Sequence, residues 1–319
     1  MARILVFLFG AFFALGACAQ SFPNKPLRIV VPFAPGGSTD IFARLLAERL
    51  SAPLGQPVVV ENRAGASGNI GAEAVAKSAP DGHTLLMATT GVMAINNSLF
   101  KNMSYDAAKD FEPVLFVASI TNVLAVPLEL PAKSVGELVA LAKKDPGKLT
   151  FASSGAGSST HLSAELFKSM AGVDVLHVPF KGSGQALIDV IAGRVSMIFD
   201  NMPSALPHIK GGKLRALGVT GSRRSGALPE VPTIAEAGVA GYESLSWSGL
   251  ALPAGAPREI VLRLNREGAA VLAAADMRQK LAEQGADAIG GPPETFAEHI
   301  RREREKWGRL VRERNIVVN

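Results

Sequence analysis

The sequence alternates short apolar runs with amphipathic helical segments over most of its length, and this alternation constrains the fold more than any other feature. Residues 27–33 are apolar and rich in β-branched side chains, and residues 38–50 follow with apolar side chains at helical spacing. Because helical patterns separate most of the apolar runs, the sequence predicts an α/β protein with doubly wound, parallel sheets. The other runs with the length and composition of buried strands are residues 58–61, 85–89, 149–153, 175–180, 195–200 and 214–220.

Two longer strand-like stretches, residues 114–126 and 245–252, interrupt this alternation. A block long enough for one lobe lies between them, and the segments outside them would form another. A chain that crosses twice between two lobes makes a two-strand hinge, and a cleft between lobes is a preferred place for a ligand. We therefore predict two α/β lobes, with residues 20–122 and 247–319 in lobe 1 and residues 123–246 in lobe 2.

The first 19 residues have the features of a secretory signal peptide. Arg3 precedes an apolar run of about 14 residues, which is short for a bilayer span. Ala17-Cys18-Ala19 then supplies a small-x-small cleavage site before Gln20. We predict that residues 1–19 are removed and that the mature protein is periplasmic. Residues 15–18 also resemble a lipobox, so lipidation of Cys18 is one alternative and an uncleaved membrane anchor is another.

Several kinds of chemistry find no support in the sequence. Cys18 is the only cysteine, so the mature chain would have no disulfide, no thiolate nucleophile and no cysteine-based metal site. The net charge is +5, but no basic cluster is interleaved with aromatic residues as in a nucleic-acid-binding face. The sequence has no Walker-type loop, no G-x-S-x-G elbow and no H-E-x-x-H motif. Gly155-Ala156-Gly157 begins like a dinucleotide fingerprint, but Thr160 stands in place of its third glycine.

Three strand-to-helix loops combine glycine with serine or threonine where a helix is expected to begin: residues 35–40, 153–161 and 180–184. Backbone N–H groups at a helix start lack intrahelical partners, and the helix dipole favours a negative charge there. Glycines allow a ligand to approach the backbone, and hydroxyls add donors. Ordinary N-capping would explain any one of these loops. Three of them at the carboxyl ends of strands predict a shared site for an anion.

Two acidic residues and one histidine in or near these loops have more than one interpretation. Asp40 and Asp200 could in principle pair as acid and base. Alternatively, Asp40 stabilises the first turn of its helix and Asp200 orients loop amides or water. His161 lies just inside a predicted helix start, where a structural or ligand-side role is favoured over that of a general base.

In combination, these motifs resemble the Bug receptors, the extracytoplasmic substrate-binding components of tripartite tricarboxylate transporters. The resemblance covers essentially the whole mature chain. It lies in Pro32-Phe33-x-Pro35-Gly36-Gly37-Ser38-Thr39-Asp40, in residues 60–68, 79–82 and 154–162, in Val178-Pro179-Phe180-Lys181-Gly182, in Phe199-Asp200 and in residues 229–233 and 238–242.

The resemblance implies a periplasmic binding protein (Venus-flytrap) fold without catalysis. Such a receptor captures a small organic carboxylate between its lobes and delivers it to the membrane subunits of a transporter, without a cofactor, a metal ion or nucleic acid; we expect a monomer. A tyrosine common in the family is Phe180 here, so one hydroxyl is absent. The ligand-binding residues implied for this chain are Phe33, Gly36, Gly37, Ser38, Asp40 and Thr90 in lobe 1, and Ser154, Gly157, Ser158, Ser159, His161, Lys181, Gly182 and Asp200 in lobe 2.

Two other functions stay open from the residues alone. A periplasmic sensory protein could bind a carboxylate in the same fold, and a secreted α/β hydrolase or dehydrogenase is a more distant alternative. The resemblance specifies a class of ligand and no single molecule.

Overall fold

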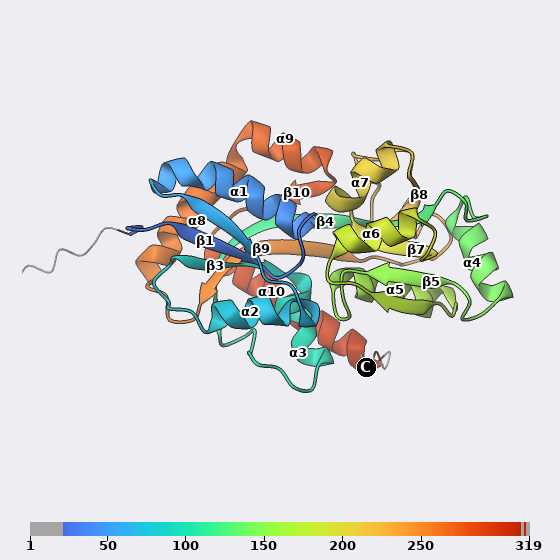
Figure 1. The fold of residues 1–319 in the computed structure, drawn as a ribbon, viewed down its shortest axis with the longest axis horizontal. Helices are drawn as coiled ribbons and strands as arrows, with labels where there is room; N and C mark the ends of the chain where they lie inside the picture. The colour runs from blue at the N-terminus through green and yellow to red at the C-terminus, as the bar shows by residue number, and fades with distance from the viewer. Residues whose placement is uncertain (1–21, 314–315, 317–319) are drawn as a thin grey trace, which may run out of the picture.

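The computed structural model describes residues 22–313 and residue 316, which form two α/β lobes side by side along the long axis of the molecule (Figure 1). The predicted signal peptide, with Cys18, lies outside these residues. No helix in the described part of the chain is long and apolar enough to cross a membrane.

Lobe 1 begins with a parallel sheet in which β1 (Leu27–Val31) lies between β2 (Val58–Asn62) and β3 (Thr84–Thr89). Helix α1 (Ser38–Leu54) follows β1 and packs on this sheet. The remaining early elements are η1 (Ala66–Gly68), α2 (Asn69–Ala76), the π-helical turn η2 (Gly91–Ile95) and α3 (Asn96–Leu99). After lobe 2, the chain returns to lobe 1 and forms α8 (Arg258–Ala273), α9 (Ala275–Glu283), β10 (Ala286–Ala288) and α10 (Pro293–Glu313).

Two long strands connect the lobes. Strand β4 (Phe111–Pro127) pairs antiparallel with β9 (Leu245–Pro253) as far as Thr121 and Leu245. It then continues into lobe 2, where it pairs with β7 (Met197–Asn201) and β8 (Leu214–Val219). At the crossing, the buried side chain of Asn122 donates to Ser163 Oγ (3.0 Å) and accepts from Ser246 Oγ (2.9 Å). These strands are the two long stretches that the sequence predicts at residues 114–126 and 245–252.

Lobe 2 repeats the alternation of strands and helices around the second half of β4. Its parallel strands β5, β6 and β7 each lead into a helix that begins within a few residues. The elements are α4 (Val135–Lys144), β5 (Thr150–Ser153), α5 (Ser159–Ala171), β6 (Leu176–Pro179), α6 (Ser183–Ile191), β7 (Met197–Asn201), α7 (Met202–Lys210) and β8 (Leu214–Val219).

The sheet is mixed, whereas the sequence predicted parallel strands. The strand order is β2-β1-β3-β9-β4-β7-β5-β6, and β4 and β9 run antiparallel to each of their neighbours. Strands β8 and β10 also pair antiparallel with β4. Every antiparallel pairing printed for the described residues includes β4 or β9, the two strands that cross between the lobes. These two strands run in opposite directions because the chain enters lobe 2 along one and returns along the other.

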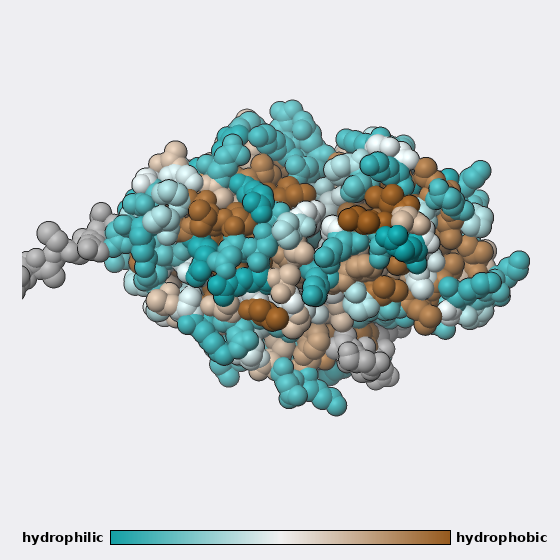
Figure 2. Space-filling model, in the orientation of Figure 1, coloured by the Kyte–Doolittle hydropathy of each residue, from teal (hydrophilic) through white to brown (hydrophobic). Residues whose placement is uncertain are grey.

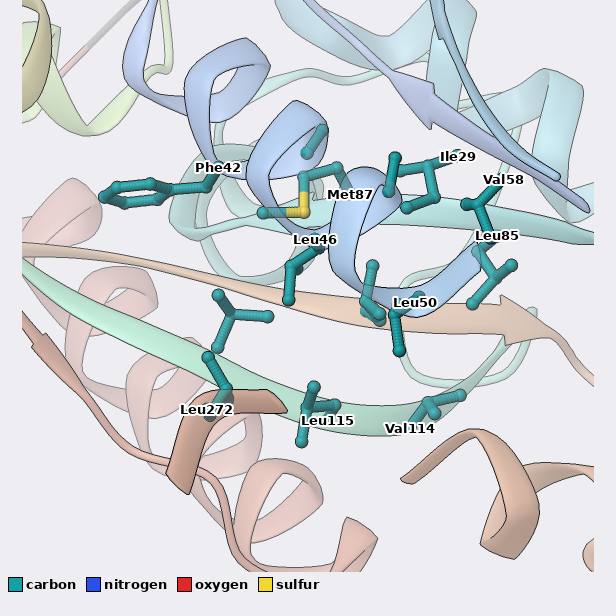
Figure 3. Packing of buried hydrophobic residues seen from close by; sticks show 14 of the residues in the cluster. Ile29, Phe42, Leu46, Leu50, Val58, Leu85, Met87, Val114, Leu115 and Leu272 are labelled. Carbon is teal, nitrogen blue, oxygen red and sulfur yellow. The ribbon is translucent and has the colours of Figure 1, made fainter. Parts of the chain in front are cut away.

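Buried apolar residues form two clusters in each lobe. The first cluster includes Phe42, Leu46 and Leu50 of α1, and Leu46 and Leu50 point from α1 toward the side of Leu115 of β4 (Figure 3). Apart from Leu162, the lobe 1 clusters contain residues up to 120 and from 247 onwards, and the lobe 2 clusters contain residues 123–242. The lobe boundaries at 122/123 and 246/247 stay a prediction. On the outer face in Figure 2, apolar residues form separate groups between hydrophilic ones.

The packing of α10 on β9 requires a glycine at position 249. A Cβ there would come within 2.3 Å of Phe296 Cζ and 2.5 Å of the Leu115 carbonyl oxygen. We expect Gly249→Ala to lower the free energy of unfolding by about 2–3 kcal/mol through overpacking, and the melting temperature by roughly 4–10 °C. Gly226→Ala is the matched control, because no atom lies within 4 Å of its added Cβ, and its effect should stay within about 0.5 kcal/mol. Urea denaturation compares the two, and equal stabilities would contradict this packing.

Candidate ligand-binding site

A small cavity lies where the two lobes face each other, and we call it the inner cavity. Its volume is about 30 Å³, which is room for about two water-sized groups. Its floor is formed by β3, β4 and β9, and its walls are formed by the residues that follow β1, β5 and β6 and by the end of β7. The carboxyl ends of strands from both lobes therefore meet at one space, as in other open α/β sheets that bind ligands.

The lobes contact each other directly around this cavity. The amide of Ala34 in lobe 1 donates to the carbonyl oxygen of Lys181 in lobe 2 (3.2 Å). Asn201 Nδ2 of lobe 2 donates to Ser38 Oγ of lobe 1 (2.5 Å). A Cβ added at Gly182 would lie 3.2 Å from the nitrogen of Ala34. The structure is thus a closed arrangement of the two lobes.

Three helices begin at the inner cavity. Helix α1 has Gly37 as its N-cap and α6 has Gly182, and a glycine has no side chain that could accept from the first amides of its helix. Helix α5 is capped by Ser158, whose Oγ accepts from the amide of His161. Among the residues that the structure describes, none accepts a hydrogen bond from the amides of Ser38 and Thr39 in α1, or from those of Ser159 and Thr160 in α5. These amides and the helix dipoles make the cavity wall electropositive.

No charged side chain lines the inner cavity in the described part of the chain. Serine and threonine hydroxyls, one asparagine amide and backbone groups supply nearly all of its polar surface. A cation would find no carboxylate there, whereas an anion would find N–H and O–H donors. Nor does the described chain hold three His, Cys, Asp or Glu side chains together in a way that could bind a metal ion.

Three polar atoms that line the inner cavity are buried and have no partner among the described residues: Thr89 Oγ1, Asn201 Oδ1 and Ser248 Oγ. Thr89 of β3 and Ser248 of β9 are directly opposed in the antiparallel pairing, and they are only 8% and 1% exposed. A buried polar group without a partner is costly and uncommon in native proteins. The two hydroxyls therefore indicate that a polar ligand group binds in this space.

Of the residues predicted from the sequence, half line a cavity. Lys181 lines a second and wider cavity, which the inner cavity adjoins. The predicted residues that line the inner cavity are Phe33, Gly37, Ser38, Ser154, Ser158 and Ser159. The seven that line neither cavity are Gly36, Asp40, Thr90, Gly157, His161, Gly182 and Asp200.

Asp40 holds the first loop in shape from behind. Its carboxylate accepts from the amide of Gly36 (3.1 Å) and from Asn62 Nδ2 (3.0 Å), and it pairs with Arg44 (2.9 Å). Burial raises the pKa of Asp40, but the hydrogen bonds from Arg44, Asn62 and Gly36 outweigh burial and hold the pKa below its ordinary value. Asp40 is therefore an ionised group that fixes the start of α1, as its structural interpretation expects.

Asp200 has the corresponding position in lobe 2. It is fully buried, and its two oxygens accept from Ser183 Oγ and Ser204 Oγ (2.5 Å each). Burial raises its pKa to about 6, against the opposing effect of these hydroxyls and of the amide of Asn201. Asp200 orients Ser183, which lines the inner cavity at the start of α6.

Three further predicted residues act on the backbone around the cavity. His161 Nδ1 accepts from the amide of Gly157 (3.1 Å), so this amide already has a partner. The His161 ring stacks on His177 with 4.1 Å between ring centroids. Thr90 Oγ1 accepts from the amide of Trp247 (3.0 Å) and so ties β3 to β9. Each of these three groups is thus already in a hydrogen bond within the protein.

Sequence reasoning missed part of the cavity lining. Thr39 and Ser183 lie within two of the loops that the sequence singled out, so the loops were correct but these members were not chosen. The serines of β9 could have been found from the sequence, because the segment around Trp247 is rich in serine. The other lining residues are positioned by strand pairing between distant segments. The full set that was missed is Thr39, Thr89, Gly91, Ile120, Ser183, Asn201, Ser246, Trp247 and Ser248.

The stacked imidazoles should make the fold sensitive to acid. Burial lowers the pKa of His161 to about 3 and that of His177 to about 4, below the ~6.5 of an unfolded chain. As the pH falls below about 6.5, the unfolded chain binds protons first, so the free energy of unfolding decreases. His161→Asn keeps an acceptor for the Gly157 amide but removes one titrating group. Between pH 7.5 and 5.0, the free energy of unfolding of this variant should therefore decrease by about 1–2 kcal/mol less than that of the wild type. Urea denaturation at both pH values measures this, and equal losses would contradict a neutral, buried His161.

Comparison with known proteins places this chain in a family. The model for the tripartite tricarboxylate transporter family receptor matches residues 42–316. Protein BugT of Bordetella pertussis is 39% identical over 314 residues, which are 98% of this chain and 96% of BugT. The solved structure of R. palustris Rpa4515 with adipate is 43% identical, with a TM-score of 0.91, and covers 93% of this chain and 99% of its own.

The fold prediction is also confirmed. The structure of the periplasmic binding protein BugD is 32% identical, with a TM-score of 0.89, and covers 93% of this chain and 99% of its own. The family and these neighbours are solute-binding receptors with two α/β lobes, and the resemblance to Bug receptors seen in the motifs is borne out. This chain belongs to the family of tripartite tricarboxylate transporter receptors.

Proposed function

We propose that this chain is a periplasmic receptor that captures a small organic carboxylate in the inner cavity and delivers it to the membrane subunits of a tripartite tricarboxylate transporter. The observation that carries this proposal is the inner cavity itself. Among the described residues, its lining has no charged side chain, three helices begin at it, and buried hydroxyls without partners face it.

A carboxylate suits this lining better than other small groups. Its two oxygens can accept from the amides at the start of α1 in one lobe and of α5 in the other, so that one group bridges the closed lobes. Thr89 and Ser248 would gain an acceptor for their hydroxyls. The adipate in the structure of the relative Rpa4515 is a ligand of this class and supports the assignment.

The residues that the structure describes near the cavity do not form a catalytic arrangement, which supports a receptor over a secreted enzyme. Asp40 and Asp200 lie behind the lining and hold loop groups. His161 is buried, accepts from a backbone amide and has a pKa of about 3, so it cannot serve as a base for a cavity serine near neutral pH. The hydroxyls therefore act as hydrogen-bond donors in our proposal.

The sensory alternative shares the same ligand site and differs only in the partner of the closed receptor. In our proposal the partner is the transporter, the receptor acts as a monomer, and residues 1–19 direct its export with cleavage before Gln20. Loss of carboxylate uptake on deletion of the gene, restored by the full chain, would distinguish transport from sensing.

Binding itself is tested by a thermal-shift screen of small organic acids, adipate among them, each paired with its neutral amide. A ligand at about 100 times its dissociation constant stabilises the fold by about 2.7 kcal/mol. For a chain of this size, we expect the melting temperature to rise by roughly 5–10 °C. The paired amide should give little shift, because it carries no charge for the helix starts. Equal shifts by acids and amides would refute an anion site.

Gly37 offers a matched pair of variants at the inner cavity. Its φ is −86°, which any residue adopts, and an added Cβ would lie 3.7 Å from Ser183 Cβ, an ordinary contact. Gly37→Ala should therefore bind almost normally, whereas the longer side chain in Gly37→Leu should enter the cavity and displace the carboxylate. Loss of about two charge-assisted hydrogen bonds, ~3 kcal/mol, corresponds to about 100-fold weaker binding.

Calorimetric titration compares the affinities of these two variants, and circular dichroism verifies that both fold. Wild-type affinity in folded Gly37→Leu would mean that the carboxylate does not contact this loop, and the site would have to be reassigned.

A further inference from the structure

The carboxyl group of Asp200 lies directly behind the lining of the inner cavity. Its Oδ1 atom is 2.5 Å from Ser183 Oγ, and Ser183 lines the inner cavity at the start of α6. Its Oδ2 atom is 2.5 Å from Ser204 Oγ of α7. All three residues lie in lobe 2, so the cluster is one unit within a single lobe. One hydroxyl, that of Ser183, thus stands between Asp200 and an anion in the inner cavity.

The hydroxyls of this cluster have too few protons for an ionised Asp200. Ser204 Oγ is also 2.9 Å from the carbonyl oxygen of Asn201. Three contacts between oxygen atoms therefore share the protons of two hydroxyls, Ser183 and Ser204. Because each hydroxyl donates only one hydrogen bond, an ionised Asp200 leaves one contact without a proton. A protonated carboxyl group supplies the third, so the geometry favours a proton on Asp200.

The charge of an ionised Asp200 has no cation beside it in the described part of the chain. The side chain is fully buried, and burial raises its pKa to about 6. Only neutral groups oppose this rise: the hydroxyls of Ser183 and Ser204 and the amide of Asn201. A second negative charge in the inner cavity would raise the pKa of Asp200 further.

The elements packed against β7 bring no charged group to Asp200. These elements are β4, β5, α5, α6 and α7. Among the described residues, none of their titratable side chains contributes to the pKa shift of Asp200. Those side chains are Glu112 of β4, His161, Glu165 and Lys168 of α5, Asp189 of α6, and His208 and Lys210 of α7.

The protonation state of Asp200 decides which way the Ser183 hydroxyl points. When Asp200 is ionised, Ser183 donates its only proton to Oδ1 and presents an oxygen lone pair to the cavity, which repels an anion. When Oδ1 carries a proton, Oδ1 donates to Ser183 Oγ, and the Ser183 proton is free to donate into the cavity. A bound carboxylate therefore gains a donor and loses a negative neighbour when Asp200 takes up a proton.

We propose that the receptor binds one proton together with its organic anion, and that Asp200 is the residue that binds the proton. The proton comes from solvent and adds to Asp200 Oδ1, the ligand stays ionised, and the Ser183 hydroxyl turns toward it. The proton thus offsets the charge of the anion beside a lining that has no basic side chain among the described residues. This inference rests on the proposed function, because it concerns the anion in the inner cavity.

Calorimetric titration measures the proton uptake directly. Purified mature protein is titrated with adipate at pH 7 in two buffers that differ in ionisation enthalpy, and the difference in heat gives the number of protons taken up per bound adipate. The affinity is then measured at pH 6.5 and 8.5, where a carboxylate like that of a Glu side chain, with a pKa of about 4.3, stays ionised. If another acid of the thermal-shift screen stabilises the protein more than adipate does, that acid takes its place.

Wild-type protein should take up about half a proton per adipate at pH 7. Because the complex holds the proton more tightly than the free receptor, the affinity should fall as the pH rises above about 6, the pKa of Asp200 without ligand. An average uptake of about half a proton over two pH units corresponds to about tenfold tighter binding at pH 6.5 than at pH 8.5.

Asp200→Asn keeps the shape of the protonated carboxyl group, and its amide can donate to Ser183. This variant should take up no proton and should bind adipate equally at both pH values. At pH 8.5 it should bind about tenfold more tightly than the wild type. Ser183→Ala removes the hydroxyl that connects Asp200 with the cavity, so its proton uptake should fall well below that of the wild type.

Asp189→Asn is the matched control. Asp189 is also an aspartate of lobe 2, but it pairs with Arg194 and lines neither the inner cavity nor the wider one. Its variant should match the wild type in proton uptake and in affinity.

The possible failures can be told apart. Binding by the wild type without proton uptake would refute the proton site while the receptor function stands. Uptake that persists in Asp200→Asn would mean that the ligand or another group takes the proton. Weaker binding by Asp200→Asn at both pH values would mean that the ionised carboxylate is the binding form, against our mechanism. If circular dichroism shows that Asp200→Asn does not fold, Ser183→Ala decides, and full uptake in that variant would overturn the role of Ser183. If no acid of the thermal-shift screen binds, the proposed function fails and this inference fails with it.

Discussion

The pairing of β4 with β9 is the interaction on which the rest of the structure depends. These two strands carry the chain between the lobes, and the buried hydrogen bonds of Asn122 to Ser163 and Ser246 hold the crossing together. The same ribbon forms the floor of the inner cavity through Ile120 of β4 and residues 246–248 of β9. Because the connection between the lobes and the base of the site are one piece of sheet, the strand ends of both lobes are brought to a single space.

The site separates binding groups from the groups that hold them. Amides and hydroxyls line the inner cavity, while the carboxylates of Asp40 and Asp200 lie behind it and fix the starts of α1 and α6. A carboxylate in the lining itself would repel an anionic ligand, whereas behind the loops it orders donors that would otherwise rotate. His161 has the same kind of role, since its neutral ring accepts from Gly157 and orders the loop that leads to α5.

The loops were predictable from sequence because a glycine beside a serine at a strand-to-helix junction is a local pattern. It predicts a helix start with free backbone amides and a hydroxyl donor. The helix starts of α1, α5 and α6 follow from that pattern, and so does the family. The hydroxyls of Thr89 and Ser248 do not, since only the antiparallel register of β3 and β9 brings them together. Thr90 was implied by the family resemblance, and in the structure its hydroxyl accepts from the amide of Trp247. The amide of Gly157 was expected to bind ligand, but its partner is His161. The second and wider cavity, which Lys181 lines, depends on how the two lobes approach each other, and no local pattern encodes that.

A crystal structure of the mature protein with adipate would test the central claim most directly. Our account predicts one carboxylate in the inner cavity, with its oxygens at about 2.7–2.9 Å from amides at the starts of α1 and α5, and with Thr89 and Ser248 donating to it directly or through a water molecule. Adipate bound with neither carboxylate in the inner cavity would contradict it.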